Sequence, residues 1–350
     1  MTTVKMWGGA LGVVAMMAPA LASAQEIQRV SGREVTVYNL AGQVQVVRGS
    51  GADVVVRITR GGADAARLDV RTGVIDGRAT LRVVYPDDEI LYPAMGRGSN
   101  TSMRVRSDGT FWGDSRSDRG DPVRIRGSGS GLEAWADLVI EVPSGKDFAM
   151  YVAAGRVDVR GVQSDVDVRT GSGRVDVTDV TGELSVDTGS GSASIVGVRG
   201  SVKMDTGSGS VTLRNVEGDE VIVDTGSGGV RGGAIRTRSL RVDTGSGSIE
   251  LDEVTSPSVI LDTGSGSVDL VLTTDVEILD VDTGSGSVTV RAPADLGGEL
   301  EIDTGSGGID MDFAVQVRSV RRDHVIGTLG DGRGRIRIDT GSGTVRLLKN

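Results

Sequence analysis

The sequence predicts an all-β protein whose C-terminal part is a parallel, β-helix-like β-solenoid of about ten coils of 18–21 residues, preceded by an irregular β N-terminal region. Three observations lead to this prediction: a repeated Thr-Gly-Ser-Gly motif, alternation of apolar and polar residues around each copy, and a scarcity of aromatic residues in the same region. After Tyr151 the only aromatic residue is Phe313, so aliphatic side chains must fill the core there.

The motif recurs in steps of 18 to 21 residues, followed by one final step of 36 residues. Its copies begin at Thr170, Thr188, Thr206, Thr225, Thr244, Thr263, Thr283, Thr304 and Thr340. An earlier, altered copy lies at Ala153-Ala154-Gly155. Because 36 residues equal about two repeats, we expect one degenerate coil around residues 318–332.

Each repeat contains two short segments in which apolar residues alternate with polar ones. Leu240-Arg241-Val242-Asp243 precedes a corner, and Ile249-Glu250-Leu251 follows it. A period of two residues is typical of a strand with one buried face. Such a unit cannot bury its apolar face alone, whereas stacked copies form a continuous core. Gly-Ser-Gly could also close a hairpin, so an antiparallel meander or barrel stays open as an alternative.

The first 24 residues resemble a signal peptide: Lys5, then an apolar run, then Ala22-Ser23-Ala24 before Gln25. We expect cleavage there, export, and no transmembrane helix in the mature chain; an uncleaved anchor is the alternative. The expected locations are the periplasm, the cell surface or the medium.

Residues 25–150 are predicted to form an N-terminal β region, and residues 151–350 form the repeat region. Strands are expected at 35–38, 44–47, 54–58, 68–70, 81–85 and 138–142. Between them, residues 93–131 are rich in Gly, Ser, Asp and Arg, which predicts a long mobile loop. This loop is either a solvated insertion or an exposed contact site that uses Arg and Phe111-Trp112.

Composition excludes several functions. The chain has no cysteine, so disulfides, a thioether lipid anchor and thiol catalysis are absent. Its net charge of −10 lies in the repeat region, which has 20 basic and 31 acidic residues, whereas residues 25–150 have 17 of each. An acidic rod is a poor partner for nucleic acid, since phosphate contacts by Lys and Arg supply much of such affinity.

Asp-Thr-Gly-Ser is the local signature of an aspartic protease, which needs two unique aspartates that converge. Here the motif places one Asp in each of eight repeats, so we expect a row of carboxylates and no catalytic dyad. Each Asp can start a turn by accepting a backbone N–H bond. The row could alternatively hold calcium or another hard cation, because carboxylate oxygen suits such ions. The residues of this candidate cation ladder are Asp187, Asp205, Asp224, Asp243, Asp262, Asp282, Asp303 and Asp339.

Other chemistry finds little support. His324 is the only histidine, which argues against both a metal site built from histidines and a Ser-His-Asp triad. We expect His324 in an exposed loop. Gly-Ser-Gly-Ser lacks the Lys-Ser/Thr that a phosphate-binding loop requires. We therefore expect no catalytic residues and no cofactor apart from the calcium alternative.

The chain resembles a bacterial β-strand-repeat family of unknown function whose members are labelled "putative adhesin". The resemblance rests on residues 37–44, Val-Tyr-Asn-Leu-Ala-Gly-Gln-Val, and on units such as residues 281–288, Val-Asp-Thr-Gly-Ser-Gly-Ser-Val. It covers most of the mature chain and implies a β-solenoid with a role in the cell envelope or at the cell surface. The Arg-rich segment 93–131 departs from the family's compact pattern.

The leading functional hypothesis is a non-enzymatic, exported adhesin or binding module that presents a repetitive polar face to a surface polymer or an envelope protein. A periplasmic structural or regulatory scaffold is the alternative. A polysaccharide-processing enzyme is a third hypothesis, but the repeat lacks aromatic subsites and a cluster of Arg, Lys and His.

Overall fold

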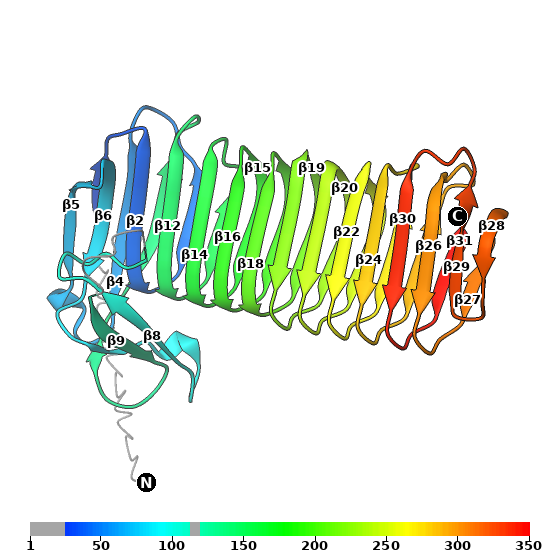
Figure 1. Cartoon of the computed structure of the whole chain (residues 1–350). Coiled ribbons are helices and arrows are strands. Elements are labelled where there is room, and N and C mark those ends of the chain that lie inside the picture. The colour runs from blue at the N-terminus through cyan, green and yellow to red at the C-terminus, as the bar shows by residue number, and fades with distance from the viewer. Residues whose placement is uncertain (1–24, 113–119) are drawn as a thin grey trace, which may run out of the picture.

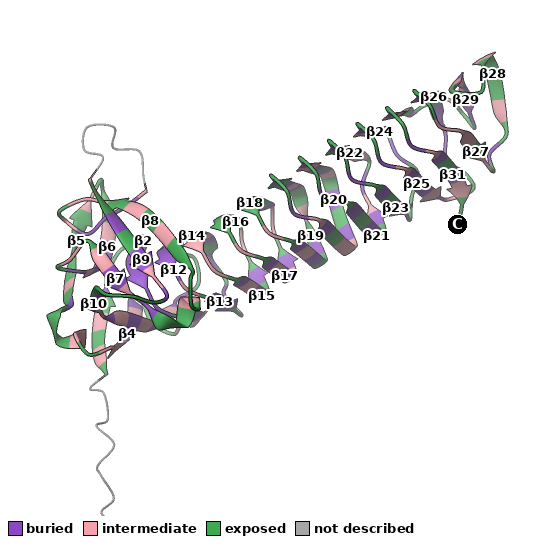
Figure 2. Cartoon of the chain, turned by 90° about the horizontal axis from the view of Figure 1, so that it is seen from below, coloured by how far each residue is buried: buried purple, intermediate pink, exposed green. Residues whose placement is uncertain are grey.

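The computed structural model describes residues 25–112 and 120–350, so the predicted signal peptide lies outside the described residues. The protein is all-β, with a large sheet of many strands and a separate four-stranded sheet. The only helices of the described chain are two short 3-10 turns, η1 (Ala65–Arg67) and η2 (Pro93–Met95). The strands stand side by side along an extended body, and the four-stranded sheet lies at its N-terminal end (Figures 1 and 2).

One row of parallel strands, here called the ladder sheet, contains every strand that leads into a Thr-Gly-Ser-Gly corner. Each strand pairs in parallel with the equivalent strand of a neighbouring repeat, so the antiparallel hairpin alternative is wrong for the repeats. In spatial order the ladder sheet comprises β2 (Glu34–Ala41), β12 (Asp147–Ala154), β14 (Asp165–Ser172), β16 (Leu184–Ser190), β18 (Val202–Ser208), the second halves of β19 (Val211–Thr225) and β20 (Val230–Thr244), β22 (Ser258–Thr263), β24 (Ile278–Thr283), β30 (Arg335–Thr340) and β26 (Gly298–Thr304).

A second row of parallel strands, the second sheet, contains the strands that follow the corners. Alternate Val, Ile and Leu side chains of both rows are buried, which is the aliphatic core that the sequence predicts. In spatial order the second sheet comprises β3 (Val44–Arg48), β13 (Val157–Arg160), β15 (Val175–Thr181), β17 (Ala193–Arg199), the first halves of β19 and β20, β21 (Ile249–Thr255), β23 (Val268–Leu272), β25 (Val288–Ala292), β31 (Val345–Lys349) and β27 (Ile309–Met311).

The C-terminal repeats are not stacked in chain order. Strand β30 pairs with β24 on one side and with β26 on the other, and β31 likewise lies between β25 and β27 (Figure 1). The segment predicted as a degenerate coil around residues 318–332 is instead part of an antiparallel hairpin of β28 (Val315–Val320) and β29 (His324–Leu329), and β29 pairs with β26. The strands at the C-terminal end of the stack, β26 and β27, thus come earlier in the chain than β30 and β31. The last repeat, formed by β30 and β31, lies between that end and the repeat of β24 and β25.

At the N-terminal end, too, the first strands of the stack are not followed directly in the chain by the strands of the next repeat. Residues 34–48 form the first repeat and residues 147–160 form the next, so the intervening chain builds the end of the stack. Residues 39–42 form a further corner, since Asn39 pairs with Val152 and Val152 with Thr170. The strands of this end are β1 (Glu26–Val30), β4 (Val54–Gly61), β5 (Asp69–Ile75), β6 (Arg78–Val84) and β11 (Trp135–Val142).

The prediction of a long mobile loop at residues 93–131 is wrong for the part that the structure describes. This segment contributes two strands to the four-stranded sheet of β10 (Leu132–Glu133), β7 (Glu89–Leu91), β9 (Asp121–Arg126) and β8 (Asn100–Val105). Its Phe111 and Ile125 side chains are buried, and the Phe111 ring meets the Tyr38 ring edge-on at 5.6 Å. A few apolar residues thus order a segment whose average composition is polar.

The second sheet bends at one position in five successive repeats. There Asp179, Gly197, Asn215, Ala234 and Glu253 have φ values between 53° and 72°. Their neighbours remain paired across the repeats, so the five residues are structurally equivalent. Left-handed backbone is unfavourable for a residue with a Cβ, which places mild strain on this column.

We expect Ala234→Gly to raise the free energy of unfolding by about 1 kcal/mol, because glycine takes a positive φ without the steric penalty. Ala193→Gly is the control: Ala193 is buried in the ordinary strand β17, where glycine should lower stability. Denaturant unfolding of both variants checks the prediction. A loss of stability in both would contradict the strain described here.

Candidate functional site

A row of eight carboxylates runs along the outer face of the ladder sheet. Each one belongs to a strand residue beside a buried threonine, and each pairs in register with the Asp of the neighbouring repeat. The predicted candidates are thus brought together in one line. Their spatial order is Asp187, Asp205, Asp224, Asp243, Asp262, Asp282, Asp339 and Asp303, with the last two exchanged relative to the chain order.

The carboxylates do not start the turns. In the described chain no backbone N–H donates to them. Instead the neighbouring threonine hydroxyl bonds the corner in six repeats, as in Thr263, whose Oγ1 accepts from the Gly266 N–H at 3.0 Å and donates to the Gly247 carbonyl at 2.8 Å. The corner is therefore held by the residue next to each aspartate. Within the row, Asp339 accepts from the Arg337 guanidinium at 3.3 Å and Asp243 lies 4.0 Å from that of Arg241.

The row is bounded at both ends by groups that carry, or can carry, positive charge. At the N-terminal end Arg169 pairs in register with Asp187, and its guanidinium lies over the Tyr151 ring, 5.3 Å from the centroid. At the other end the His324 Nδ1 lies 2.9 Å from the Asp303 Oδ2. The prediction of an exposed loop for His324 is wrong: it begins β29, and its side chain is only 23% exposed.

Mutual repulsion affects the carboxylates within the row. Burial, followed by the charges of Asp243 and Asp282, raises the pKa of Asp262 above the ordinary aspartate value. Burial and neighbouring row carboxylates likewise raise the pKa values of Asp224 and Asp339. The described residues contain no group of three or more His, Cys, Asp or Glu side chains arranged to hold a metal ion. Each repeat contributes a single carboxylate to the row.

We expect Asp262→Asn to raise the melting temperature slightly, by about 1 °C, at pH 7 and low salt. Because the folded-state pKa is raised, the ionised form destabilises the fold, so stability is greatest below the unfolded-state pKa and is lost as the pH rises through the folded-state pKa. The gain should therefore shrink at acidic pH and in about 1 M NaCl, where the Debye length is about 3 Å.

Asp252→Asn is the matched control for this measurement. Asp252 is exposed on the second sheet, and its registered neighbour in the preceding repeat is Gly233 instead of a carboxylate. An equal rise in melting temperature for both variants would contradict repulsion along the row.

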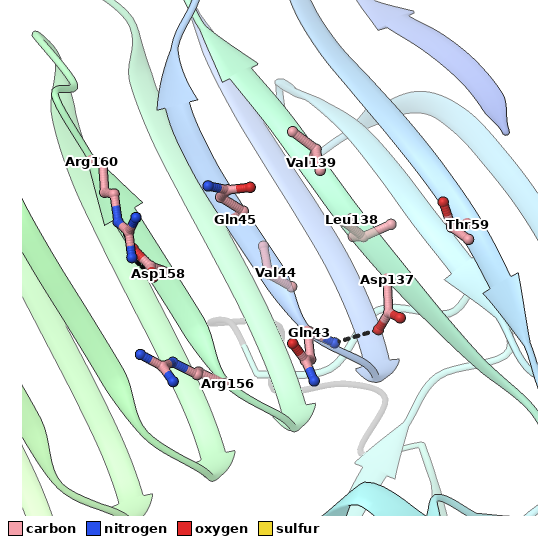
Figure 3. A pocket seen from close by; sticks show the side chains of 10 residues that line it. All are labelled: Gln43, Val44, Gln45, Thr59, Asp137, Leu138, Val139, Arg156, Asp158 and Arg160. Carbon is pink, nitrogen blue, oxygen red and sulfur yellow. Dashed lines mark hydrogen bonds and ion pairs between the residues drawn. The ribbon is translucent and has the colours of Figure 1, made fainter.

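A shallow groove lies at the N-terminal end of the second sheet, where β4, β11, β3 and β13 meet (Figure 3). Its volume is about 430 Å³, and polar side chains dominate its lining. Gln43 lies between Arg156 and Asp137 in this view, and the Gln43 backbone N–H donates to the Asp137 Oδ1 at 2.8 Å. Burial raises the pKa of Asp137, and this hydrogen bond partly offsets the shift. A second cavity, of about 450 Å³, adjoins the first and shares Gln43 and Arg156 with it.

The groove residues occupy one structural position in successive strands. The strand registers align Asp137, Gln43, Arg156 and Arg174 with one another, and the same position is serine in the next two repeats. Sequence analysis missed this site. The available signal was the departure of Gly-Arg156 and Gly-Arg174 from the Gly-Ser that ends most corners.

Solved structures similar to this chain include the following three. A "putative cell adhesion protein" from Clostridium sporogenes is 10% identical with a TM-score of 0.23, and the match covers 93% of this chain and 99% of that chain. A "putative lipid binding protein" from Parabacteroides distasonis is 10% identical with a TM-score of 0.42, covering 93% and 96%. A "putative adhesin" from Bacteroides fragilis is 12% identical with a TM-score of 0.33, also covering 93% and 96%.

No curated protein matches this chain in sequence. No helix within residues 25–112 and 120–350 is long and apolar enough to cross a membrane. The model of one protein family matches residues 137–348, which is more than half of the chain and includes all nine Thr-Gly-Ser-Gly motifs. By this match the chain belongs to the Toastrack DUF4097 family.

Proposed function

We propose that this protein is an exported, non-enzymatic binding module of the cell envelope or cell surface, and that its repeats form a parallel β-solenoid of about ten coils of 18–21 residues. The parallel pairing of equivalent strands in neighbouring repeats supports the solenoid. The partner is a surface polymer or an envelope protein that lies along the body.

The row of eight aspartates carries this proposal. Adjacent strands of a sheet lie about 4.8 Å apart, so the row offers carboxylate acceptors at a regular spacing. An extended partner with repeated cationic or donor groups can contact many of them at once. Such contacts are individually weak, but linking them raises the overall affinity without a deep pocket.

Binding of the purified protein to isolated envelope fragments tests the role of the row. A variant with Asp224, Asp243, Asp262 and Asp282 replaced by Asn should bind at least ten-fold more weakly, and binding by the parent protein should weaken with salt. The control replaces Glu250, Asp252 and Asp269 of the second sheet with Gln, Asn and Asn. Equal binding by all three proteins would exclude the row as the contact surface.

Protease treatment of intact cells tests the location. Digestion on intact cells supports a surface adhesin. Protection until the outer envelope is opened instead supports the periplasmic scaffold and removes the adhesin hypothesis.

The row as a cation ladder is a further proposal with its own test. If calcium bridges neighbouring carboxylates, the melting temperature of the parent protein should rise in calcium above its value in chelator at matched ionic strength, and the four-fold Asn variant should lose this rise. If the parent protein melts at the same temperature in calcium and in chelator, the cation proposal is excluded and the binding proposal is unaffected.

A further inference from the structure

We propose that the groove at the N-terminal end of the second sheet binds a segment of an uncharged oligosaccharide. This site is separate from the aspartate row and goes beyond the proposed function by assigning a second surface and a ligand class. The inference rests on the charge balance of the groove, on its unused hydrogen-bonding groups, and on its confinement to the first repeats.

Charge balance favours a neutral ligand. The Arg156 guanidinium lies 2.7 Å from the Asp176 carboxylate, which Arg174 also contacts at 2.7 Å. Along β13, the strand that Arg156 precedes, the Arg160 Nε donates to the Asp158 Oδ1 at 2.6 Å. An approaching anion meets arginines that are already neutralised, and an approaching cation meets Asp158 and Asp176, which are already paired. The third carboxylate, Asp137, is half-buried and accepts the Gln43 backbone N–H. Neither sign of charge gains the electrostatic energy that would make it the preferred ligand.

The groove also offers donors and acceptors that the protein does not use. Among the described residues, the side chains of Gln43, Gln45 and Thr59 have no hydrogen-bond partner, although all three line the groove. Each can both donate and accept, as a sugar hydroxyl can. The Arg156 side chain is 54% exposed and uses only part of its five N–H donors on Asp176. Planar groups of this kind match pairs of neighbouring hydroxyls.

The shape suits a chain more than a small compact molecule. The two cavities of about 430 and 450 Å³ share Gln43 and Arg156, and the second is also lined by Met95 and by Asn100 of the four-stranded sheet. Val139 contributes a half-buried apolar surface on the groove floor, against which the apolar face of a sugar ring can pack. Later repeats carry serine, glycine or threonine where the groove has arginine, so the site occurs once along the body.

Isothermal titration of the full chain with maltohexaose, cellohexaose and N-acetylchitohexaose tests the proposal. We expect at least one of these neutral glycans to bind, and Gln43→Ala combined with Arg156→Ala to weaken that binding at least ten-fold. Asp176 keeps Arg174 as a partner in this variant, so the fold should be retained, as melting temperature can verify.

Arg231→Ala is the matched control, since Arg231 is an exposed residue of the second sheet that pairs with Glu250 away from the groove. The four-fold Asn variant of the aspartate row should bind the glycan normally, which separates this proposal from the proposed function. Binding confined to a heparin hexasaccharide or to hexalysine would overturn the charge-balance argument. Failure of all three neutral glycans to bind at millimolar concentration, or equal binding by the groove variant, would overturn the proposal.

Discussion

Gly247→Ala is expected to lower the free energy of unfolding by about 3 kcal/mol, because an added methyl group has no room at the corner. A Cβ built on Gly247 would lie 2.0 Å from the carbonyl oxygen of Gly228 and 2.4 Å from its carbonyl carbon. The obstacle is backbone of the neighbouring repeat, which cannot turn aside as a flexible side chain could. The second glycine of each motif makes the same close approach, so relieving the clash at one repeat requires displacing a stacked column.

Gly233→Ala is the control for this prediction. Gly233 lies in the strand that precedes the Gly247 corner, and a Cβ there meets nothing within 4 Å. Alanine should be neutral or slightly stabilising at that position, because glycine weakens a strand interior. Chemical denaturation compares the two variants, and hydrogen exchange of residues 245–249 shows whether the loss is local. A Gly247 variant as stable as the Gly233 variant would contradict the close stacking of the corners.

The repeat and its core were predictable because both follow from local rules. Alternation in segments such as residues 240–243 defines which face is buried, and the regular spacing of the motif defines the parallel register. The family resemblance was likewise correct. Since a sheet register aligns equivalent residues, the sequence was sufficient to bring the eight aspartates into one row.

The order of the final repeats could not be predicted, because Thr283, Thr304 and Thr340 begin identical motifs. Identical edges can pair in any order, so the outcome depends on the β28–β29 hairpin, which occupies the outer edge of β26 and leaves its inner edge for β30. The average composition also led to a wrong prediction for residues 93–131. There the burial of Phe111 and Ile125 decides the structure, whereas an average over the segment hides them.

Identical motifs also adopt two corner structures, which no local pattern distinguishes. From Thr225 onwards the threonine hydroxyl accepts a bond from the backbone N–H three residues later, as at Thr263. In the three earlier repeats the hydroxyls of Thr170, Thr188 and Thr206 are buried and have no hydrogen-bond partner among the described residues. The same Thr-Gly-Ser-Gly motif thus forms a corner with a threonine hydroxyl hydrogen bond in one part of the stack and a corner without that bond in another.

Thr263→Val is expected to lower the free energy of unfolding by about 2 kcal/mol, because it leaves two backbone groups without their partner. The Gly266 N–H loses its acceptor, and the Gly247 carbonyl loses its donor, within a corner where Thr263 is fully buried. Valine has nearly the same shape, so lost hydrogen bonding, and not packing, accounts for the change.

Thr188→Val should instead be neutral, or stabilising by up to about 1 kcal/mol, since it removes a buried hydroxyl that has no protein partner. Both variants replace the same buried hydroxyl by a methyl group in the same motif, so the difference between their unfolding free energies reports on the corner hydrogen bonds. Equal losses would mean that the two corner forms are energetically alike. The expected asymmetry would show that the Thr-Gly-Ser-Gly motif is stabilised by hydrogen bonds to threonine only where the repeat has lengthened from 18 to 19 or more residues, as it does from Thr225 onwards.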